Sequence, residues 1–183
     1  MPYIIIGIIN ALILLYFFMT YNDLVTLRNK VRNQKSQVDI SLKMRFDLIP
    51  NLVEIVKGYA NHEKTVLEDV IKARNVYVTA GSNTAQALEA DNALTGVLGK
   101  LFALSENYPE LKANANFTSL QDDLYNTEQK IAYSRQFYND SVFTFNNKIE
   151  MFPSNLVAGM FNFQKKAFFE AVESERENVK LSF

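Results

Sequence analysis

The chain has 183 residues, with 19 Lys or Arg against 20 Asp or Glu, so its formal net charge is -1. This balance argues against a general nucleic-acid binder, which carries a basic excess on one face. The absence of cysteine excludes disulfides, iron–sulfur clusters and zinc sites with thiolate ligands.

The first residues of the chain are apolar enough to cross a membrane. Residues 3–21 carry no charge, and at ~1.5 Å per residue a helix of that length spans about 28 Å, close to the ~30 Å hydrocarbon core of a bilayer. A cleaved signal peptide is the alternative, but no basic residue precedes the run and residues 17–22 are poor for cleavage. We predict an uncleaved transmembrane anchor over residues 1–21.

Basic residues flank this anchor on one side only. The short N-terminus has none, whereas Arg28, Lys30, Arg32 and Lys35 lie within about 15 residues of the other end. The positive-inside rule therefore predicts a single-pass protein of the cell membrane, with a short N-terminus outside and the C-terminal domain in the cytoplasm.

The region after the anchor keeps a helical period of apolar residues as far as residue 60. Pro50 does not disturb the phase, so we predict one helix over 22–60 that is kinked at Pro50 rather than ended there and that can continue the anchor. Its spacing resembles that of a coiled coil. The apolar series is Leu24, Leu27, Val31, Val38, Leu42, Phe46, Ile49, Val53, Val56 and Ala60.

Two shorter helices are predicted next. Residues 66–77 place apolar side chains on one face, and the composition of residues 80–83 indicates a loop. A third helix over 84–107 follows, and Pro109 is expected to end it.

Residues 117–152 show the most regular pattern, and Pro153 is expected to stop this fourth helix. A long amphipathic helix must bury its apolar stripe against other helices. We therefore predict an all-α fold, in which the N-terminal transmembrane helix is followed by an elongated antiparallel four-helix bundle over residues 22–152. The stripe is Phe117, Leu120, Leu124, Thr127, Ile131, Ser134, Tyr138, Val142, Phe145, Ile149 and Phe152.

Residues 153–183 form a segment that is first apolar and then charged, and we expect it to pack on the bundle or to extend it. Its aromatic residues lack a regular period, so they either cap the bundle or form an interface. The apolar surface of residues 24–38 is expected to lie beyond the reach of the other helices. Both surfaces predict a homo-oligomer in the membrane, where confinement favours weak lateral contacts. The aromatic residues concerned are Phe161, Phe163, Phe168 and Phe169.

The sequence contains no catalytic, cofactor-binding or metal-binding pattern. His62 is the only histidine, so a bundle site with two Glu-x-x-His pairs is excluded. At a predicted turn, His62 is most simply a hydrogen-bonding group at a helix boundary. A site made of carboxylates alone is harder to exclude, although Asp47, Glu54 and similar residues more commonly form a solvated or salt-bridged face.

Several segments, in this order, resemble the LemA family of bacterial membrane proteins. The resemblance covers nearly the whole chain after the anchor. Its motifs are YNDLVTLRNKV (21–31), DLIPNLVE (47–54), VKGYANHE (56–63), YPELKAN (108–114), NFTSLQ (116–121), TEQKIAYSRQFYN (127–139) and FPSNLVA (152–158).

The resemblance implies an N-terminal membrane anchor, a cytoplasmic four-helix domain and no established catalytic activity. The family is similar to a magnetosome membrane protein, and its genes often lie near genes for membrane metalloproteases. The resemblance implies other membrane proteins as partners, such as a membrane metalloprotease. The anchor, the surplus apolar surface and the balanced charge add the lipid bilayer and further copies of the chain as expected partners, and no nucleic acid.

These observations favour a membrane-anchored helical scaffold or interaction module, with no catalytic activity and no cofactor. The alternatives are a self-assembling membrane-shaping protein and, from another class, a bundle enzyme with a carboxylate metal or cofactor site. In the DLIPNLVE motif we expect Leu48, Ile49, Leu52 and Val53 to be buried. Pro50 is expected to set a kink, around which Asp47 and Asn51 form hydrogen bonds. The candidate interaction or structural residues are Asp47, Pro50, Asn51, Glu54, His62 and the four C-terminal phenylalanines.

Overall fold

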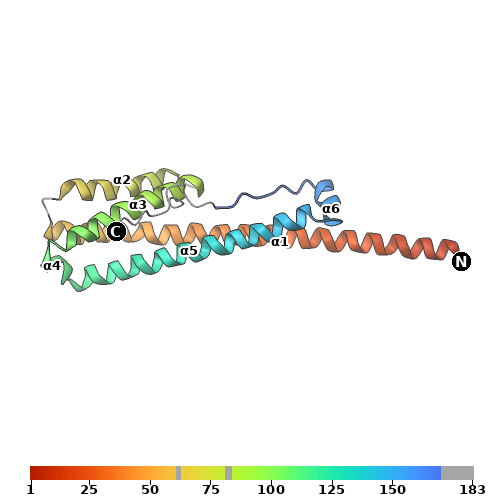
Figure 1. The fold of residues 1–183 in the computed structure, drawn as a ribbon, viewed down its shortest axis with the longest axis horizontal. Helices are drawn as coiled ribbons and strands as arrows, with labels where there is room; N and C mark the ends of the chain where they lie inside the picture. Colours follow the sequence, from red (N-terminus) through yellow and green to blue (C-terminus); the bar gives the residue numbers. More distant parts are fainter. Residues whose placement is uncertain (61–62, 81–83, 170–183) are drawn as a thin grey trace, which may run out of the picture. The chain divides into compact units, whose positions relative to one another are not determined.

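The computed structural model describes residues 1–60, 63–80 and 84–169, which are mostly helical and contain no strand (Figure 1). The all-α prediction is confirmed. Six helices follow one another in these ranges: α1 (Pro2–Tyr59), α2 (Lys64–Ala80), α3 (Thr84–Ser105), α4 (Pro109–Lys112), α5 (Ala115–Glu150) and α6 (Ser154–Met160).

Helix α1 is continuous from the apolar N-terminus to Tyr59, including Pro50. A proline inside a helix removes one backbone hydrogen bond. Burial of its neighbours offsets that loss, because Ile49, Leu52 and Val53 are almost inaccessible to solvent while Pro50 itself is exposed. The prediction that the helix continues through Pro50 is therefore confirmed.

The chain divides into two compact units. One, here the central unit, is residues 37–134; the other, here the terminal unit, combines residues 1–36 with residues 135–183, of which the structure describes those up to 169. Helices α1 and α5 each contribute residues to both units.

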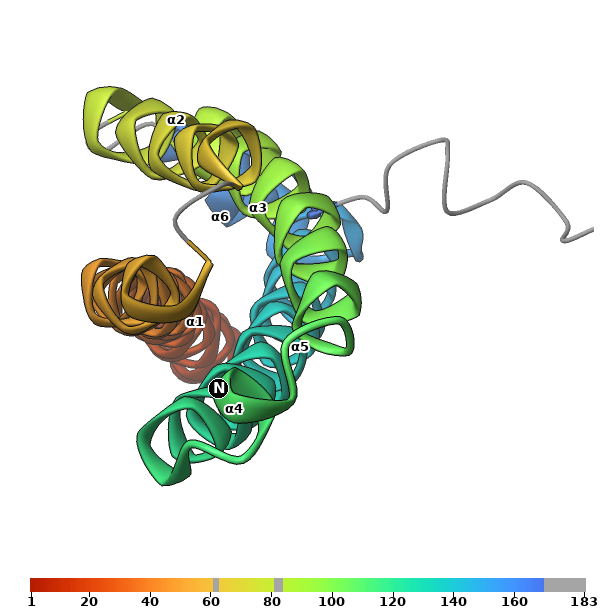
Figure 2. The ribbon, with the colours of Figure 1, turned by 90° about the vertical axis from the view of Figure 1, so that its left-hand side faces the viewer.

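The central unit is an antiparallel bundle of four helical segments. Helices α2 and α3 lie side by side, and together with parts of α1 and α5 they surround a common core (Figure 2). Phe46 stacks on the ring of Tyr77, with ring centroids 3.8 Å apart. The core consists mainly of residues at the predicted helical spacing: Phe46, Ile49, Leu52, Val53, Val56, Ala60, Leu67, Val70, Ala73, Ala90, Leu94, Leu98, Leu101, Leu111, Phe117 and Leu124.

The connection between α3 and α5 differs from the prediction. Helix α3 ends at Ser105, and Pro109 begins the short helix α4 rather than ending α3. Proline suits the first turn of a helix, where its missing N–H has no intrahelical partner. Asn114 then caps α5, since its side-chain oxygen accepts hydrogen bonds from the backbone N–H groups of Asn116 and Phe117, at 2.9 and 3.1 Å.

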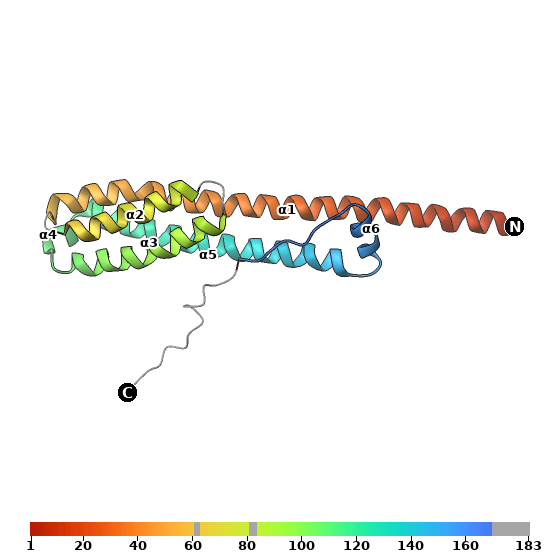
Figure 3. The ribbon, with the colours of Figure 1, turned by 90° about the horizontal axis from the view of Figure 1, so that it is seen from above.

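The terminal unit contains the start of α1, the end of α5, helix α6 and an extended segment after it (Figure 3). Helix α6 was not predicted, because its apolar residues lack a period and fill barely two turns. The prediction that Phe152 belongs to the α5 stripe is wrong. Helix α5 ends at Glu150, before Phe152, and the Phe152 side chain is 79% exposed.

The expected uncovered apolar surface at residues 24–38 is also absent. Leu24, Val31 and Val38 are 0–4% exposed. In the terminal unit the antiparallel α5 extends far enough to cover α1, and Lys148 of α5 forms an ion pair with Asp23 at 2.8 Å. The sequence pattern predicted the length of α5, but it did not predict which residues of α1 this helix covers.

Candidate functional site

The N-terminal part of α1 carries the clearest functional feature. Among the helices of the described residues, α1 alone is long and apolar enough to cross a membrane, and only 6% of its apolar window is buried. A core helix of a soluble protein buries such side chains, whereas the large apolar residues from Tyr3 to Tyr16 are 42–86% exposed. These side chains belong to a candidate membrane span, which the sequence predicts over residues 1–21.

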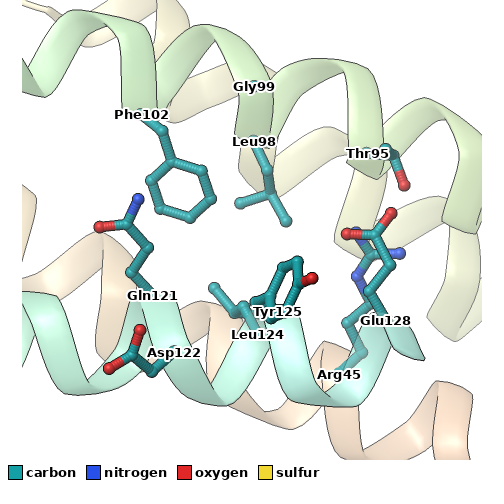
Figure 4. A pocket seen from close by; sticks show the side chains of 10 residues that line it. All are labelled: Arg45, Thr95, Leu98, Gly99, Phe102, Gln121, Asp122, Leu124, Tyr125 and Glu128. Carbon is teal, nitrogen blue, oxygen red and sulfur yellow. The ribbon is translucent and has the colours of Figure 1, made fainter. Parts of the chain in front are cut away.

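The central unit contains a cavity of about 400 Å³ between α1, α3 and α5. Figure 4 shows Leu98 and Phe102 of α3 above Leu124 and Tyr125 of α5, with Arg45 of α1 at one end of the space. A cavity of this volume is within the range of small-molecule sites.

Charge in this cavity is compensated by the protein itself. The Arg45 guanidinium donates to Asp91 Oδ1 at 2.8 Å, and both side chains are almost fully buried. The partly exposed Glu128 lies 3.8 Å from the second terminal nitrogen of Arg45. Because a buried charge needs a partner, this pair links α1 to α3 and leaves no net positive charge for an anionic ligand.

The groups around the Arg45 cavity do not form a catalytic arrangement. The Thr95 hydroxyl donates to the backbone oxygen of Asp91 at 3.1 Å, so it is not oriented by a general base. On the same bundle, burial raises the pKa of Tyr77, and the carboxylates of Asp39, Asp47 and Asp91 raise it further. Within the described ranges no group of three His, Asp or Glu side chains is placed to hold a metal ion. The cavity is best explained as a packing feature around a structural ion pair.

The predicted residues of the DLIPNLVE motif lie on the outside of the bundle. Asp47, Pro50, Asn51 and Glu54 are all exposed, and their spacing places them on one face of α1. Asp47 forms an ion pair with Lys43 one turn earlier, at 2.5 Å, rather than a hydrogen bond around Pro50. Leu48, expected to be buried, is only partly buried. His62 lies outside the described residues.

The four C-terminal phenylalanines have different environments. Phe163 is 9% exposed and packs on Tyr21 and Phe145, while the guanidinium of Arg28 lies 5.4 Å from its ring centre. Phe169 packs on Tyr138 with ring centroids 4.3 Å apart. Phe161 and Phe168 remain about half exposed, at 46% and 45%. Phe163 and Phe169 thus fold back onto the helices, as the capping alternative describes.

Two asparagines of α5 hold the extended segment, and sequence reasoning missed both. Asn146 donates to the backbone oxygen of Lys166 and accepts from its N–H, at 2.8 and 2.9 Å. Asn139 binds the backbone of Phe169 in the same two-point way, at 2.9 and 2.8 Å. Asn139 and Asn146 are seven residues apart on a helix, and Lys166 and Phe169 are three residues apart in an extended chain. Both separations are about 10 Å, so the two asparagines match the two backbone positions that they bind. We call Asn139 and Asn146 the asparagine pair.

Helix α5 also presents aromatic side chains to solvent. Tyr125, Tyr133, Phe137 and Phe143 are 58–63% exposed. Tyr133 and Phe137 are one turn apart, and Tyr125 and Phe143 are separated by about five turns, so each pair shares a side of the helix. Together they form what we call the α5 aromatic face, opposite the buried stripe.

Comparison with known proteins gives consistent matches along the chain. The model of the LemA family matches residues 34–183. Protein LemA of Metamycoplasma hominis is 26% identical over 170 residues, covering 91% of this chain and 78% of that protein. Magnetosome protein MamQ 2 of Paramagnetospirillum magneticum is 25% identical over 177 residues, covering 83% of this chain and 65% of its own length.

A further relative is magnetosome protein MamQ of Magnetospirillum gryphiswaldense, which is 24% identical over 176 residues, or 82% of this chain. The chain spans 65% of the length of these two MamQ proteins.

Proposed function

The chain belongs to the LemA family, and we propose that it is a membrane-anchored, non-catalytic interaction module that organises partners at the cell membrane. One observation carries this proposal: the exposed apolar span and the buried core stripe are two parts of the same uninterrupted helix, α1. The helical domain is therefore attached directly to its anchor.

The proposed orientation places the short N-terminus outside the cell and the helical domain in the cytoplasm. It rests on the basic residues that follow the span, of which Arg28 and Lys30 are the nearest. Asp23, the first charged residue after the span, is paired with Lys148 and so adds little net negative charge to this flank.

The α5 aromatic face supports the interaction part of the proposal. Exposed Tyr and Phe side chains are enriched at protein interfaces, where they bury a large area at low conformational cost. The Arg45 cavity offers no competing chemistry, since its charge is compensated and its Thr95 hydroxyl is bonded to backbone.

The partners we propose are reached laterally in the membrane. They are further copies of the chain and other membrane proteins, such as a membrane metalloprotease. Anchoring restricts copies and partners to two dimensions, which raises their effective concentration, so a modest aromatic contact suffices.

Crosslinking in native membranes tests this function. A photoreactive phenylalanine analogue replaces Tyr125 or Tyr133 in the full-length protein, and Val76 of α2, 52% exposed, is the matched control position. We expect crosslinked products from the two α5 positions that are absent from position 76. A product of twice the mass identifies a second copy, and a different mass identifies another protein. Equal yields at all three positions, or none, would contradict the proposal.

A further inference from the structure

The turn between α5 and α6 exposes a group of large apolar side chains. Met151, Phe152, Leu156, Met160 and Phe161 are 46–79% exposed. From Met151 to Gln164 the sequence carries no charged residue, although Glu150 and Lys165 flank the stretch and pair with each other. We call residues 151–161 the α5–α6 tip. Contiguous exposed apolar surface bordered by polar residues marks a contact with a partner or a membrane.

The tip lies beside the end of the candidate span. The ring of Phe161 packs on Phe17 and Tyr21, with centroids 5.7 and 4.5 Å apart. Two residues after Tyr21, Asp23 of α1 forms an ion pair with Lys148 of α5. Beyond this pair, residues 1–22 of the chain carry no charged side chain, and on α5 only Glu150, which is paired with Lys165, lies between Lys148 and the tip.

The depth of the tip along α1 can be estimated from these contacts. Phe17 and Asp23 are six residues apart, and at ~1.5 Å per residue this places the level of Phe17 about 9 Å beyond Asp23 toward the span. Helices that lie in a membrane interface bury their apolar face to about 5–10 Å. If Asp23 marks the aqueous edge of the span, the tip is at interfacial depth.

Hydrogen bonds within the chain satisfy backbone groups at both ends of α6, which favours contact with lipid. The Ser154 hydroxyl lies 2.7 Å from the backbone oxygen of Lys148 and 2.8 Å from that of Met151, so it bonds the free carbonyl end of α5. At the other end of α6, the N–H groups of Asn162 and Phe163 donate to Gly159 and Ala158, at 3.2 and 3.0 Å. Asn162 has φ 53°, and these bonds form a Schellman motif.

The two sides of α6 then have separate roles. Ser154, Val157 and Ala158 are buried and attach α6 to the terminal unit, whereas Leu156 and Met160, one turn apart, point away from it. No buried contact requires leucine and methionine at the two outward positions.

We propose that the α5–α6 tip inserts its exposed apolar side chains into the bilayer leaflet on the domain side of the span, as a second membrane contact of the same chain. This inference rests on the proposed membrane anchoring by α1. The occupant of the tip surface is lipid, because the surface is continuous, through Phe161, Phe17 and Tyr21, with the surface of the span itself. The tip and the span together fix the tilt of the terminal unit at the membrane, which a single helix does not.

Depth-dependent fluorescence quenching tests the insertion. The chain has no cysteine, so single substitutions give unique labelling sites in the full-length protein. Phe152→Cys and Leu156→Cys place an environment-sensitive dye on the tip. Ile8→Cys places it in the span, and Val78→Cys, an apolar position 60% exposed on α2 and outside the α5 aromatic face, is the matched control. Each variant is reconstituted in vesicles of phosphatidylcholine and phosphatidylglycerol, with quenchers placed in the lipid chains or in the water.

We expect lipid quenchers to reduce the fluorescence at positions 8, 152 and 156, and aqueous iodide to reduce it only at position 78. If position 8 is quenched by lipid quenchers while positions 152 and 156 behave like position 78, the tip proposal is overturned and the anchor remains intact. If positions 152 and 156 are protected from iodide and are not quenched by the lipid quenchers, protein covers the tip. That result also overturns the tip proposal. Failure of lipid quenching at position 8 contradicts the proposed anchoring itself.

Discussion

The Asn146 side chain forms a two-point hydrogen bond with the backbone of Lys166, in which its amide nitrogen donates and its amide oxygen accepts. These two bonds satisfy the backbone N–H and C=O groups of Lys166, as a neighbouring β-strand would. Since Asn139 binds Phe169 in the same way, the backbone rather than the sequence of this segment is recognised.

Asn146→Ala is therefore expected to loosen residues 164–169 while leaving the bundle intact. Losing two hydrogen bonds of about 1 kcal/mol each raises the population of the detached segment roughly tenfold or more. Trypsin cleavage after Lys165 and Lys166 measures that population. Asn147→Ala, at the neighbouring partly buried position, is the control, and an equal increase in cleavage there would contradict the specific role of Asn146.

Tyr138 attaches the same segment through its hydroxyl, which donates to the backbone oxygen of Ala167 at 3.0 Å. Burial raises the pKa of Tyr138 above its usual value. The folded state thus holds the phenolic proton more tightly than the unfolded state, so the stabilisation is fully present below about pH 10 and is lost as pH rises through the folded pKa.

Urea unfolding of wild type and Tyr138→Phe across neutral and alkaline pH measures this effect. We expect wild type to be the more stable protein at neutral pH, by about 1 kcal/mol for the lost hydrogen bond. The difference between the two proteins should shrink above pH 10, and a difference that stays constant or grows would rule out this linkage.

The buried pair of Arg45 and Asp91 gives a prediction for the central unit. Asp91→Ala removes the partner at 2.8 Å from the buried guanidinium and leaves it the more distant Glu128, so we expect a loss of about 3–5 kcal/mol in unfolding free energy. The double variant Arg45→Met/Asp91→Leu removes both charges and should recover most of that loss, because apolar replacements of buried ion pairs are commonly tolerated. A double variant as unstable as Asp91→Ala alone would show that the unpaired charge is not the cause.

Helical periodicity predicted the bundle because large apolar residues determine which side of a helix is buried. All residues of the stripe from Leu24 to Ala60 except the partly buried Leu27, and most of the stripe from Phe117 to Phe145, are core positions. The prediction failed where that rule does not apply. Helix α6 is too short to show a period, and Phe152 kept the phase of a helix that had already ended at Glu150.

The polar features could not be read from the sequence for a different reason. Arg45 and Asp91 lie 46 residues apart, and nothing in either local pattern distinguishes them from solvated charges. The asparagine pair resembles ordinary polar positions of a helix, since its partners are backbone groups. Its one sequence signal is the seven-residue spacing of two asparagines beside the apolar stripe.

The α5 stripe itself can be tested by truncation. Leu124→Ala or Ile131→Ala removes a side chain that is 2% exposed, and each is expected to cost roughly 2–4 kcal/mol. Tyr125→Ala, at an exposed position adjacent to Leu124, should change the unfolding free energy by about 0.5 kcal/mol or less. Chemical denaturation in mild detergent gives all three values, and losses below about 0.5 kcal/mol at both stripe positions would mean that this stripe is not core.

The orientation of the anchor predicts which residues a membrane-impermeant thiol reagent can reach in intact cells. Pro2→Cys lies at the proposed outer end of α1, whereas Val78→Cys lies on α2 in the proposed cytoplasmic domain, at a position 60% exposed. Because basic residues follow the span and none precedes it, we expect position 2 to be labelled and position 78 to be protected until the cells are permeabilised. The exposure of Val78 means that burial in the fold cannot account for its protection. Labelling of position 78 but not position 2 in intact cells would reverse the proposed topology and place the helical domain, with its α5 aromatic face, outside the membrane.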